Sequence, residues 1–167
     1  MRYPYKIRDV EPGAVDPVHR MNEQALPHVN SVTPEYFHAQ VAAHGSYFRA
    51  VYLDREPVAF LLAMNEAAAY DSMNFLWFRD RYPQFVYIDR VVVAAVHRRA
   101  GLGATLYDDL MQWATPRTSR LACEVNVRPS NEPSMRFHRK QGFMPVGTQD
   151  TDGGRKTVSL MIKELGA

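Results

Sequence analysis

The segment VVVAAVHRRAGLGA, residues 91–104, decides the fold more than any other part of the chain. It opens with three consecutive valines, a pattern typical of a central strand covered on both faces. A short basic turn with Arg98 and Arg99 follows, and a helix then begins near Gly101 and Gly103. Apolar residues recur along that helix at the spacing of one face, at Leu102, Leu106, Leu110 and Trp113. The segment therefore predicts a buried strand, a basic turn and a helix packed on a sheet.

The start of this predicted helix has the chemistry of an anion site. The first N–H groups of a helix lack intrahelical partners, and the helix dipole adds partial positive charge there. Glycines allow a ligand oxygen to approach the backbone, while Arg98 and Arg99 add charge and forked donors. These features suit a pyrophosphate. The alternative, a strand–helix connection whose glycines only permit close packing, stays open at this point.

Composition limits the remaining possibilities. The 167 residues predict one domain over 1–167, and the formal net charge of +2 is too balanced for a dedicated nucleic-acid binder. The single cysteine cannot form an internal disulfide. We find no signal-peptide pattern, no apolar run of the roughly 20 residues that span a bilayer, and no histidine spacing typical of zinc. We therefore expect a cytoplasmic protein without a metal and without membrane or nucleic-acid partners.

Strand and helix patterns alternate along the chain. Expected strands cover residues 5–10, 47–53, 58–64, 85–93, 121–127, 143–147 and 156–163. Expected helices cover residues 16–26, 34–44, 101–114 and 133–141. We interpret residues 65–83 as an irregular, aromatic-rich insertion. This order predicts an α/β (α+β) fold with a mixed sheet of six to seven strands flanked by helices.

Two motifs resemble one family. The run Arg98-Arg99-Ala100-Gly101-Leu102-Gly103 is similar to the acyl-CoA signature Gln/Arg-x-x-Gly-x-Gly/Ala of the GNAT N-acetyltransferase superfamily. A second pattern of that superfamily resembles the downstream residues Asn131, Ser134, Phe137, His138, Gly142 and Phe143. Both motifs stand in the family order, and the elements over residues 5–163 also follow that fold.

The resemblance implies acetyl-CoA as the donor and a primary amine as the acceptor, with direct attack in a ternary complex. The pantetheine arm would pair with the main chain of Val91, Val92 and Val93. The amides from Arg98 to Ala104 would hold the pyrophosphate, and Asn131, Ser134, Phe137 and His138 would contact CoA. The resemblance also allows a homodimer, and it does not identify the acceptor.

The resemblance and the strand pattern together give three main catalytic candidates and one weaker one. His138 stands where the family usually has a tyrosine that assists departure of the thiolate, although it could instead only line the CoA groove. Asp89 on the central strand is the first candidate for the base, with a structural ion pair to a neighbouring arginine as the alternative. Glu124 and Asn126 share one face of the adjacent strand, so Glu124 is a second candidate. Glu23 is a weaker option, and a chain of water molecules could replace a dedicated base.

Three other interpretations remain open. The aromatic insertion at residues 70–82 could form a wall of the acceptor site, where Asp71 and Asp80 would favour a cation, or a satellite apolar cluster or dimer contact. The chain could be a non-catalytic acyl-CoA sensor. His97, Arg98 and Arg99 could contact nucleic acid, although three residues are few for that purpose.

Overall fold

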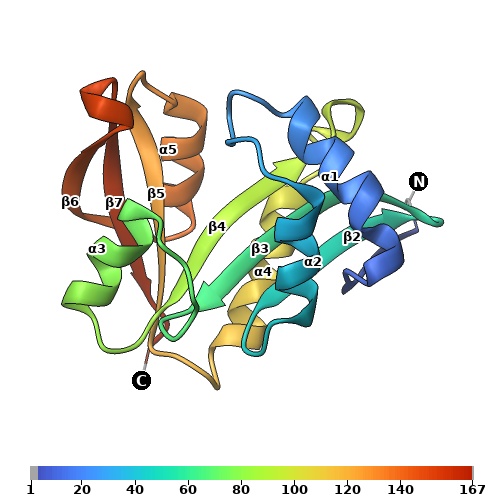
Figure 1. The fold of residues 1–167 in the computed structure, drawn as a ribbon, viewed down its shortest axis with the longest axis horizontal. Helices are drawn as coiled ribbons and strands as arrows, with labels where there is room; N and C mark the ends of the chain where they lie inside the picture. Colours follow the sequence, from blue (N-terminus) through green and yellow to red (C-terminus); the bar gives the residue numbers. More distant parts are fainter. Residues whose placement is uncertain (1–3, 167) are drawn as a thin grey trace. The chain divides into compact units, whose positions relative to one another are not determined.

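The computed structural model describes residues 4–166 and contains a seven-stranded sheet in the order β1-β2-β3-β4-β5-β7-β6 (Figure 1). The strands are β1 (Tyr5–Asp9), β2 (Tyr47–Leu53), β3 (Glu56–Asn65), β4 (Val86–Val93), β5 (Arg120–Arg128), β6 (Met144–Thr151) and β7 (Lys156–Glu164). The helices are α1 (Val15–Gln24), α2 (Pro34–Ala42), α3 (Met73–Arg81), α4 (Leu102–Ala114) and α5 (Glu132–Lys140), with short 3₁₀ turns η1 (Pro12–Ala14), η2 (Ala95–His97) and η3 (Asp152–Gly154).

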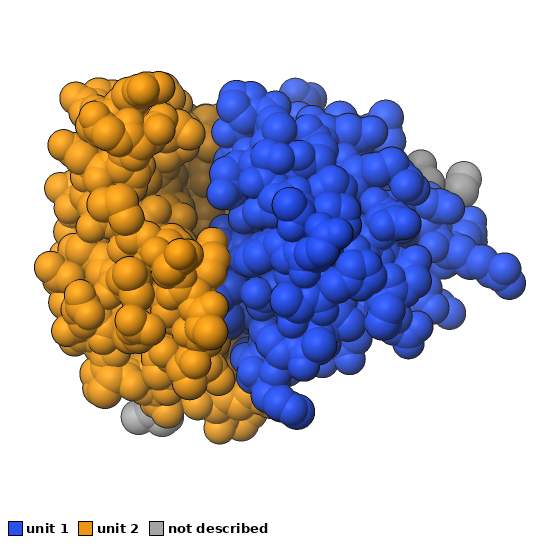
Figure 2. Space-filling model, in the orientation of Figure 1, with its two compact units in different colours: residues 1–64, 88–113 blue, residues 65–87, 114–167 orange. Residues whose placement is uncertain are grey.

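The chain divides into two compact units, which Figure 2 colours separately. Unit 1 takes residues 1–64 and 88–113, and unit 2 takes residues 65–87 and 114–167. The expectation of one domain over the whole chain stays a prediction. No helix within residues 4–166 is long and apolar enough to cross a membrane.

In unit 1, helices cover both faces of the antiparallel strands β1, β2 and β3. Phe37 of α2 packs against Phe48 and Phe60, which lie on one face of β2 and β3. On the opposite face, Tyr47 and Arg49 of β2 both donate hydrogen bonds to Asp109 of α4. Because successive residues of a strand point to opposite faces, α2 and α4 pack on different sides of these strands.

In unit 2, the register of four strands defines one continuous face. Tyr87 at the start of β4 pairs in parallel with Ala122 of β5, and Glu124 lies two residues further on. Glu124 faces Leu160 of β7, which in turn pairs with Gly147 of β6. Paired residues lie on the same face, so these side chains share one side of the unit 2 strands.

Most of the predicted elements are confirmed. The mixed sheet has seven strands, β4 occupies its centre, and α2 begins as expected, with the Thr33 hydroxyl accepting from the Tyr36 N–H. The prediction that both faces of β4 are covered is wrong in part. Val92 is buried, whereas Val91 and Val93 are half-buried. These two valines lie on one face of the strand, and that face is covered incompletely.

The interpretation of residues 65–83 as irregular is wrong, because Met73–Arg81 forms α3. Local signals for this helix are weak: Ser72 at the N-cap makes no side-chain capping bond, and the first turn has no acidic residue. Tertiary burial of Phe75 and Phe78 stabilises it instead, and such burial supplies most helical stability in proteins. Of the interpretations of the aromatic segment, the apolar cluster is confirmed, since both rings are fully buried.

Candidate active site

The turn between β4 and α4 in unit 1 has the geometry of an anion site. Arg98 and Arg99 are exposed, and no acidic residue lies in the first turn of α4. The Thr105 N–H donates to the Gly101 carbonyl at 3.0 Å, which fixes Gly101 at the helix start. The N–H groups of the next three residues therefore precede the first intrahelical bond. The structure thus brings together the residues predicted to hold a pyrophosphate, from Arg98 to Ala104.

The backbone of this turn explains one of its glycines. Arg99 has φ +71° and Gly101 has φ +75°, so the chain enters the left-handed region twice within three residues. A Cβ added at Gly101 would meet no atom within 4 Å, so the requirement for glycine is conformational rather than steric. The Tyr5 hydroxyl lies 3.2 Å from His97 Nδ1 and ties the preceding turn to β1.

Asp89, the first candidate for the base, is part of a buried ion pair in unit 1. Its Oδ2 accepts from Arg90 Nε at 2.8 Å and from the Tyr36 hydroxyl at 2.9 Å. The side chains of Asp89 and Arg90 are only 4% and 2% exposed. The alternative foreseen for Asp89, a structural ion pair with a neighbouring arginine, is therefore present.

Arg90 itself joins β4 to the segment between α1 and α2. Its Nη1 donates to Asn22 Oδ1 at 2.9 Å and to the Asn30 carbonyl at 3.0 Å. Its Nη2 donates to Asn30 Oδ1 at 2.8 Å. A guanidinium with this many directed bonds holds the segment in one place. The sequence indicated an arginine partner for Asp89 but not the bonds from Arg90 to Asn22 and Asn30, which depend on the tertiary structure.

Glu23, the weaker candidate, is already hydrogen-bonded within unit 1. Its carboxylate accepts from the Ser31 hydroxyl and, at 2.8 Å, from Asn22 Nδ2. The bond from Ser31, followed by the bond from Asn22, lowers the pKa of Glu23. A carboxylate stabilised in its charged form is a weak proton acceptor, so this geometry does not favour Glu23 as a base.

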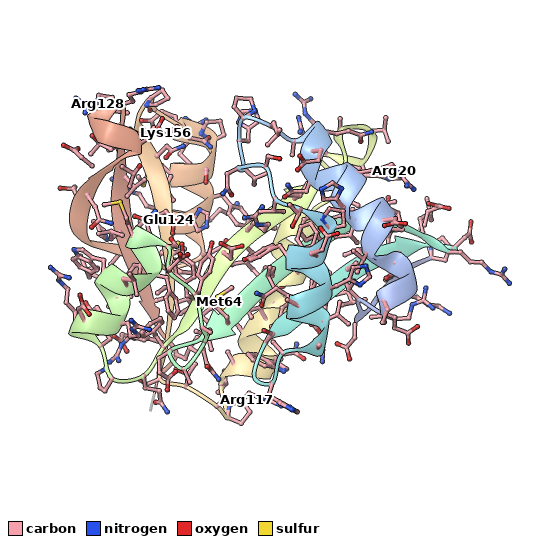
Figure 3. The ribbon with its side chains drawn as sticks, in the orientation of Figure 1. Arg20, Met64, Arg117, Glu124, Arg128 and Lys156 are labelled. Carbon is pink, nitrogen blue, oxygen red and sulfur yellow. The ribbon has the colours of Figure 1, made fainter. Side chains whose placement is uncertain are left out.

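Glu124 in unit 2 forms a pair with Tyr87. Figure 3 labels Glu124 on β5, where it is half-buried. The Tyr87 hydroxyl donates to Glu124 Oε2 at 2.7 Å, and Tyr87 is only 1% exposed. The predicted shared face of Glu124 and Asn126 is confirmed, since they pair with Leu160 and Val158 of β7. Sequence reasoning missed Tyr87, because its position beside Glu124 depends on the register between β4 and β5.

His138 in unit 2 is buried on α5 and bonded to its own helix. Its Nδ1 lies 2.8 Å from the Ser134 carbonyl, which can only accept. This bond assigns the hydrogen of the neutral ring to Nδ1 and leaves Nε2 as an acceptor. Burial lowers the pKa of His138, opposed by the bond to the Ser134 carbonyl. A neutral ring of this tautomer cannot donate from Nε2 to a departing thiolate.

The other residues predicted to contact CoA lie on or beside α5. Asn131 caps the helix, with its Oδ1 accepting from the Ser134 N–H at 3.3 Å. Phe137 is half-buried, and its ring lies 5.3 Å from the His138 ring. Cys123 of β5 is buried, and burial raises the pKa of its thiol. No group of three metal-ligating side chains occurs among residues 4–166.

Comparison with known proteins places this geometry in context. Residues 16–143 match the model of the acetyltransferase (GNAT) family. No curated protein matches the chain. Among solved structures, the ribosomal-protein-S18-alanine N-acetyltransferase from Escherichia coli has a TM-score of 0.75 at 15% identity, covering 98% of this chain and 95% of that chain.

Two further structures share the fold. Ard1 from Thermoplasma volcanium has a TM-score of 0.78 at 16% identity and covers 98% of this chain and 99% of its own. NAA60 from Arabidopsis thaliana, in complex with a bisubstrate analogue, has a TM-score of 0.76 at 17% identity and covers 96% and 97%. NAA60 is also known in complex with acetyl-CoA. At these identities the likeness shows the fold alone.

Proposed function

The chain belongs to the GNAT acetyltransferase family, and from this premise we propose that it transfers the acetyl group of acetyl-CoA to a primary amine. The single observation that carries the proposal is the start of α4, where exposed Arg98 and Arg99 precede the N–H groups that come before the first intrahelical bond. A helix N-terminus of this kind suits the pyrophosphate of CoA. The relative NAA60, known in complex with acetyl-CoA, supports the choice of donor.

The residues predicted to bind acetyl-CoA belong to β4 and the start of α4, and to α5 with its cap. The main chain of Val91, Val92 and Val93 would pair with the pantetheine arm, and the amides from Arg98 to Ala104 would hold the pyrophosphate. The half-buried state of Val91 and Val93 is compatible with a ligand along this strand. Asn131, Ser134, Phe137 and His138 would add contacts from α5.

Glu124 is our candidate for the general base. A primary amine must lose a proton to attack, and a carboxylate within hydrogen-bond reach can take that proton. The neutral amine nitrogen then forms a C–N bond to the thioester carbonyl. As the tetrahedral intermediate collapses, the C–S bond breaks and the nitrogen releases its second proton to solvent, which leaves the amide. The Tyr87 hydroxyl, bonded to Glu124 Oε2, holds the carboxylate in one orientation. Asp89 would serve as buried support for Arg90 and Tyr36 rather than as the base.

The thiolate would leave without a proton from His138. The neutral Nδ1–H tautomer commits the ring hydrogen to Ser134, and the lowered pKa keeps the ring neutral at pH 7. The thiolate therefore takes its proton from solvent. Of the two roles foreseen for His138, this geometry favours the contact with CoA.

An acetylation screen tests the proposal. We would incubate the protein with acetyl-CoA and a panel of amines, amino acids and peptides, and follow release of the CoA thiol. Replacing Glu124 by glutamine should lower kcat by about 10²- to 10⁴-fold, the usual contribution of a general base. Glu56→Gln is a matched control, because Glu56 is an exposed glutamate at the start of β3. Equal rates for the two variants would refute Glu124 as the base.

A non-catalytic acyl-CoA sensor is the second candidate, favoured by the engaged state of both Asp89 and His138. Calorimetric binding of CoA without turnover of any acceptor would support it. A homodimer, a cytoplasmic location and the absence of nucleic-acid binding stay predictions from the sequence. Competition for the protein between CoA and DNA tests the last of these.

A further inference from the structure

Helix α3 covers the unit 2 face that carries Glu124. Trp77 lies against Gly147, where an added Cβ would come within 2.7 Å of its ring. On the same side, Gln149 Nε2 donates to Asn74 Oδ1 at 2.9 Å. Gly147 shares a face with Glu124 through Leu160, so both contacts fix α3 over that face.

The buried aromatic residues of α3 surround the ring of Tyr87. The ring centroids of Phe75 and Phe78 lie 5.6 Å and 6.1 Å from that of Tyr87, and Tyr70 lies 6.3 Å away. Phe75 and Phe78 are fully buried. Such rings attract one another at these separations in tilted or edge-to-face arrangements.

This packing determines where the Tyr87 hydroxyl lies. A tyrosine side chain has two torsions, so neighbours that fix its ring also fix its oxygen. Here that oxygen lies 2.7 Å from Glu124 Oε2. Removing an aromatic neighbour leaves space into which the Tyr87 ring can rotate, and the bond to Glu124 then weakens.

We propose that Phe75 and Phe78 of α3 are positioning residues that hold the Tyr87 hydroxyl on the Glu124 carboxylate. The inference rests on the proposed function, since it assigns the pair a role in acetyl transfer. It assigns α3 a role in positioning the Tyr87 hydroxyl, which is separate from the role in CoA binding that the family signature assigns to α4. The aromatic segment was interpreted either as a wall of the acceptor site or as an apolar cluster. In this proposal the apolar cluster affects proton transfer from the acceptor amine, because it holds the Tyr87 hydroxyl against Glu124.

A double-mutant cycle tests the coupling. Phe78→Leu and Tyr87→Phe should each lower kcat about tenfold and leave KM for acetyl-CoA unchanged. The double variant should be no slower than Tyr87→Phe alone, because both changes remove the same interaction. A decrease in kcat of the double variant equal to the product of the two single decreases would overturn the proposal. Phe48→Leu is the matched control, since it makes the same change in the unit 1 core, where Phe48 packs on Phe37, and should keep wild-type kcat.

A spectroscopic measurement keeps the test independent of turnover. With ¹³C-tyrosine labelling, the Tyr87 Cζ resonance, assigned through Tyr87→Phe, should shift in Phe78→Leu and in Phe75→Leu but not in Phe48→Leu. An unmoved resonance in both phenylalanine variants would refute the positioning role. If Glu124→Gln keeps full activity while the resonance shifts, the packing is present but Glu124 is not the base. That result would refute the proposed mechanism and, with it, a role for the packing in catalysis.

Discussion

Replacing Arg90 by methionine should destabilise unit 1 strongly. The change removes a guanidinium whose side chain is 2% exposed and leaves Asp89, 4% exposed, without its ionic partner. It also deprives Asn22 and Asn30 of three donated hydrogen bonds. Breaking a buried ion pair by removing one partner costs about 3–5 kcal/mol, mainly because the remaining charge stays buried. Methionine fills only the space of the aliphatic part of the arginine side chain, so the buried space left by the guanidinium group adds to this loss.

Urea denaturation measures the effect. At a slope of about 2 kcal/mol per molar urea, a loss of about 4 kcal/mol lowers the midpoint by about 2 M. The double variant Asp89→Asn/Arg90→Met should recover part of this loss, because no uncompensated charge remains. Hydrogen exchange should also rise in residues 25–33, which Arg90 holds through Asn30. A loss below about 1 kcal/mol, as surface pairs give, would show that the pair is not buried in solution.

Three other perturbations have defined outcomes. Burial lowers the pKa of His138 below its unfolded value, so stability is fully present above pH 6.5 and falls as the pH drops through that value. Melting temperatures between pH 5 and 8 should show this fall, and His138→Phe should reduce it; an identical pH dependence would contradict a buried neutral ring. Gly147→Ala should cost about 1–3 kcal/mol through its clash with Trp77, and less in a Trp77→Leu background, as urea titration would show. Burial raises the pKa of the Cys123 thiol, so a thiol reagent should label it only upon unfolding, and rapid labelling of the folded protein would contradict its burial.

The sequence predicted most of the fold because its strands and caps carry local signals. Thr33, Pro34 and Glu35 specify the start of α2 through capping, which depends on neighbours in the chain. Helix α3 was missed because its stability comes from burial of Phe75 and Phe78, a tertiary effect without a local pattern.

The candidate site shows the same limit. The position of residues 98–104 at the start of α4 was predictable, since a helix N-terminus is a local structure, and their role in binding a pyrophosphate stays a prediction. The partner of Glu124 was not, because Tyr87 reaches it only through the register of β4 on β5. The tautomer of His138 likewise depends on the side-chain orientation that places Nδ1 2.8 Å from the Ser134 carbonyl, which the predicted helix over residues 133–141 does not specify.

The contrast between Asp89 and Glu124 explains why two strand carboxylates would not have the same role. To accept a proton, Asp89 must give up a charge-assisted bond from Arg90, and such bonds are roughly twice as strong as neutral ones. Protonation would also leave the guanidinium buried without its counter-ion, which is costly at 2% exposure. Glu124 accepts a hydrogen bond from the neutral phenol of Tyr87. Protonation of Glu124 therefore leaves no positive charge without a counter-ion at that bond. The nature of each partner, more than the position of each acid on its strand, therefore favours Glu124 for proton transfer and Asp89 for support of the fold.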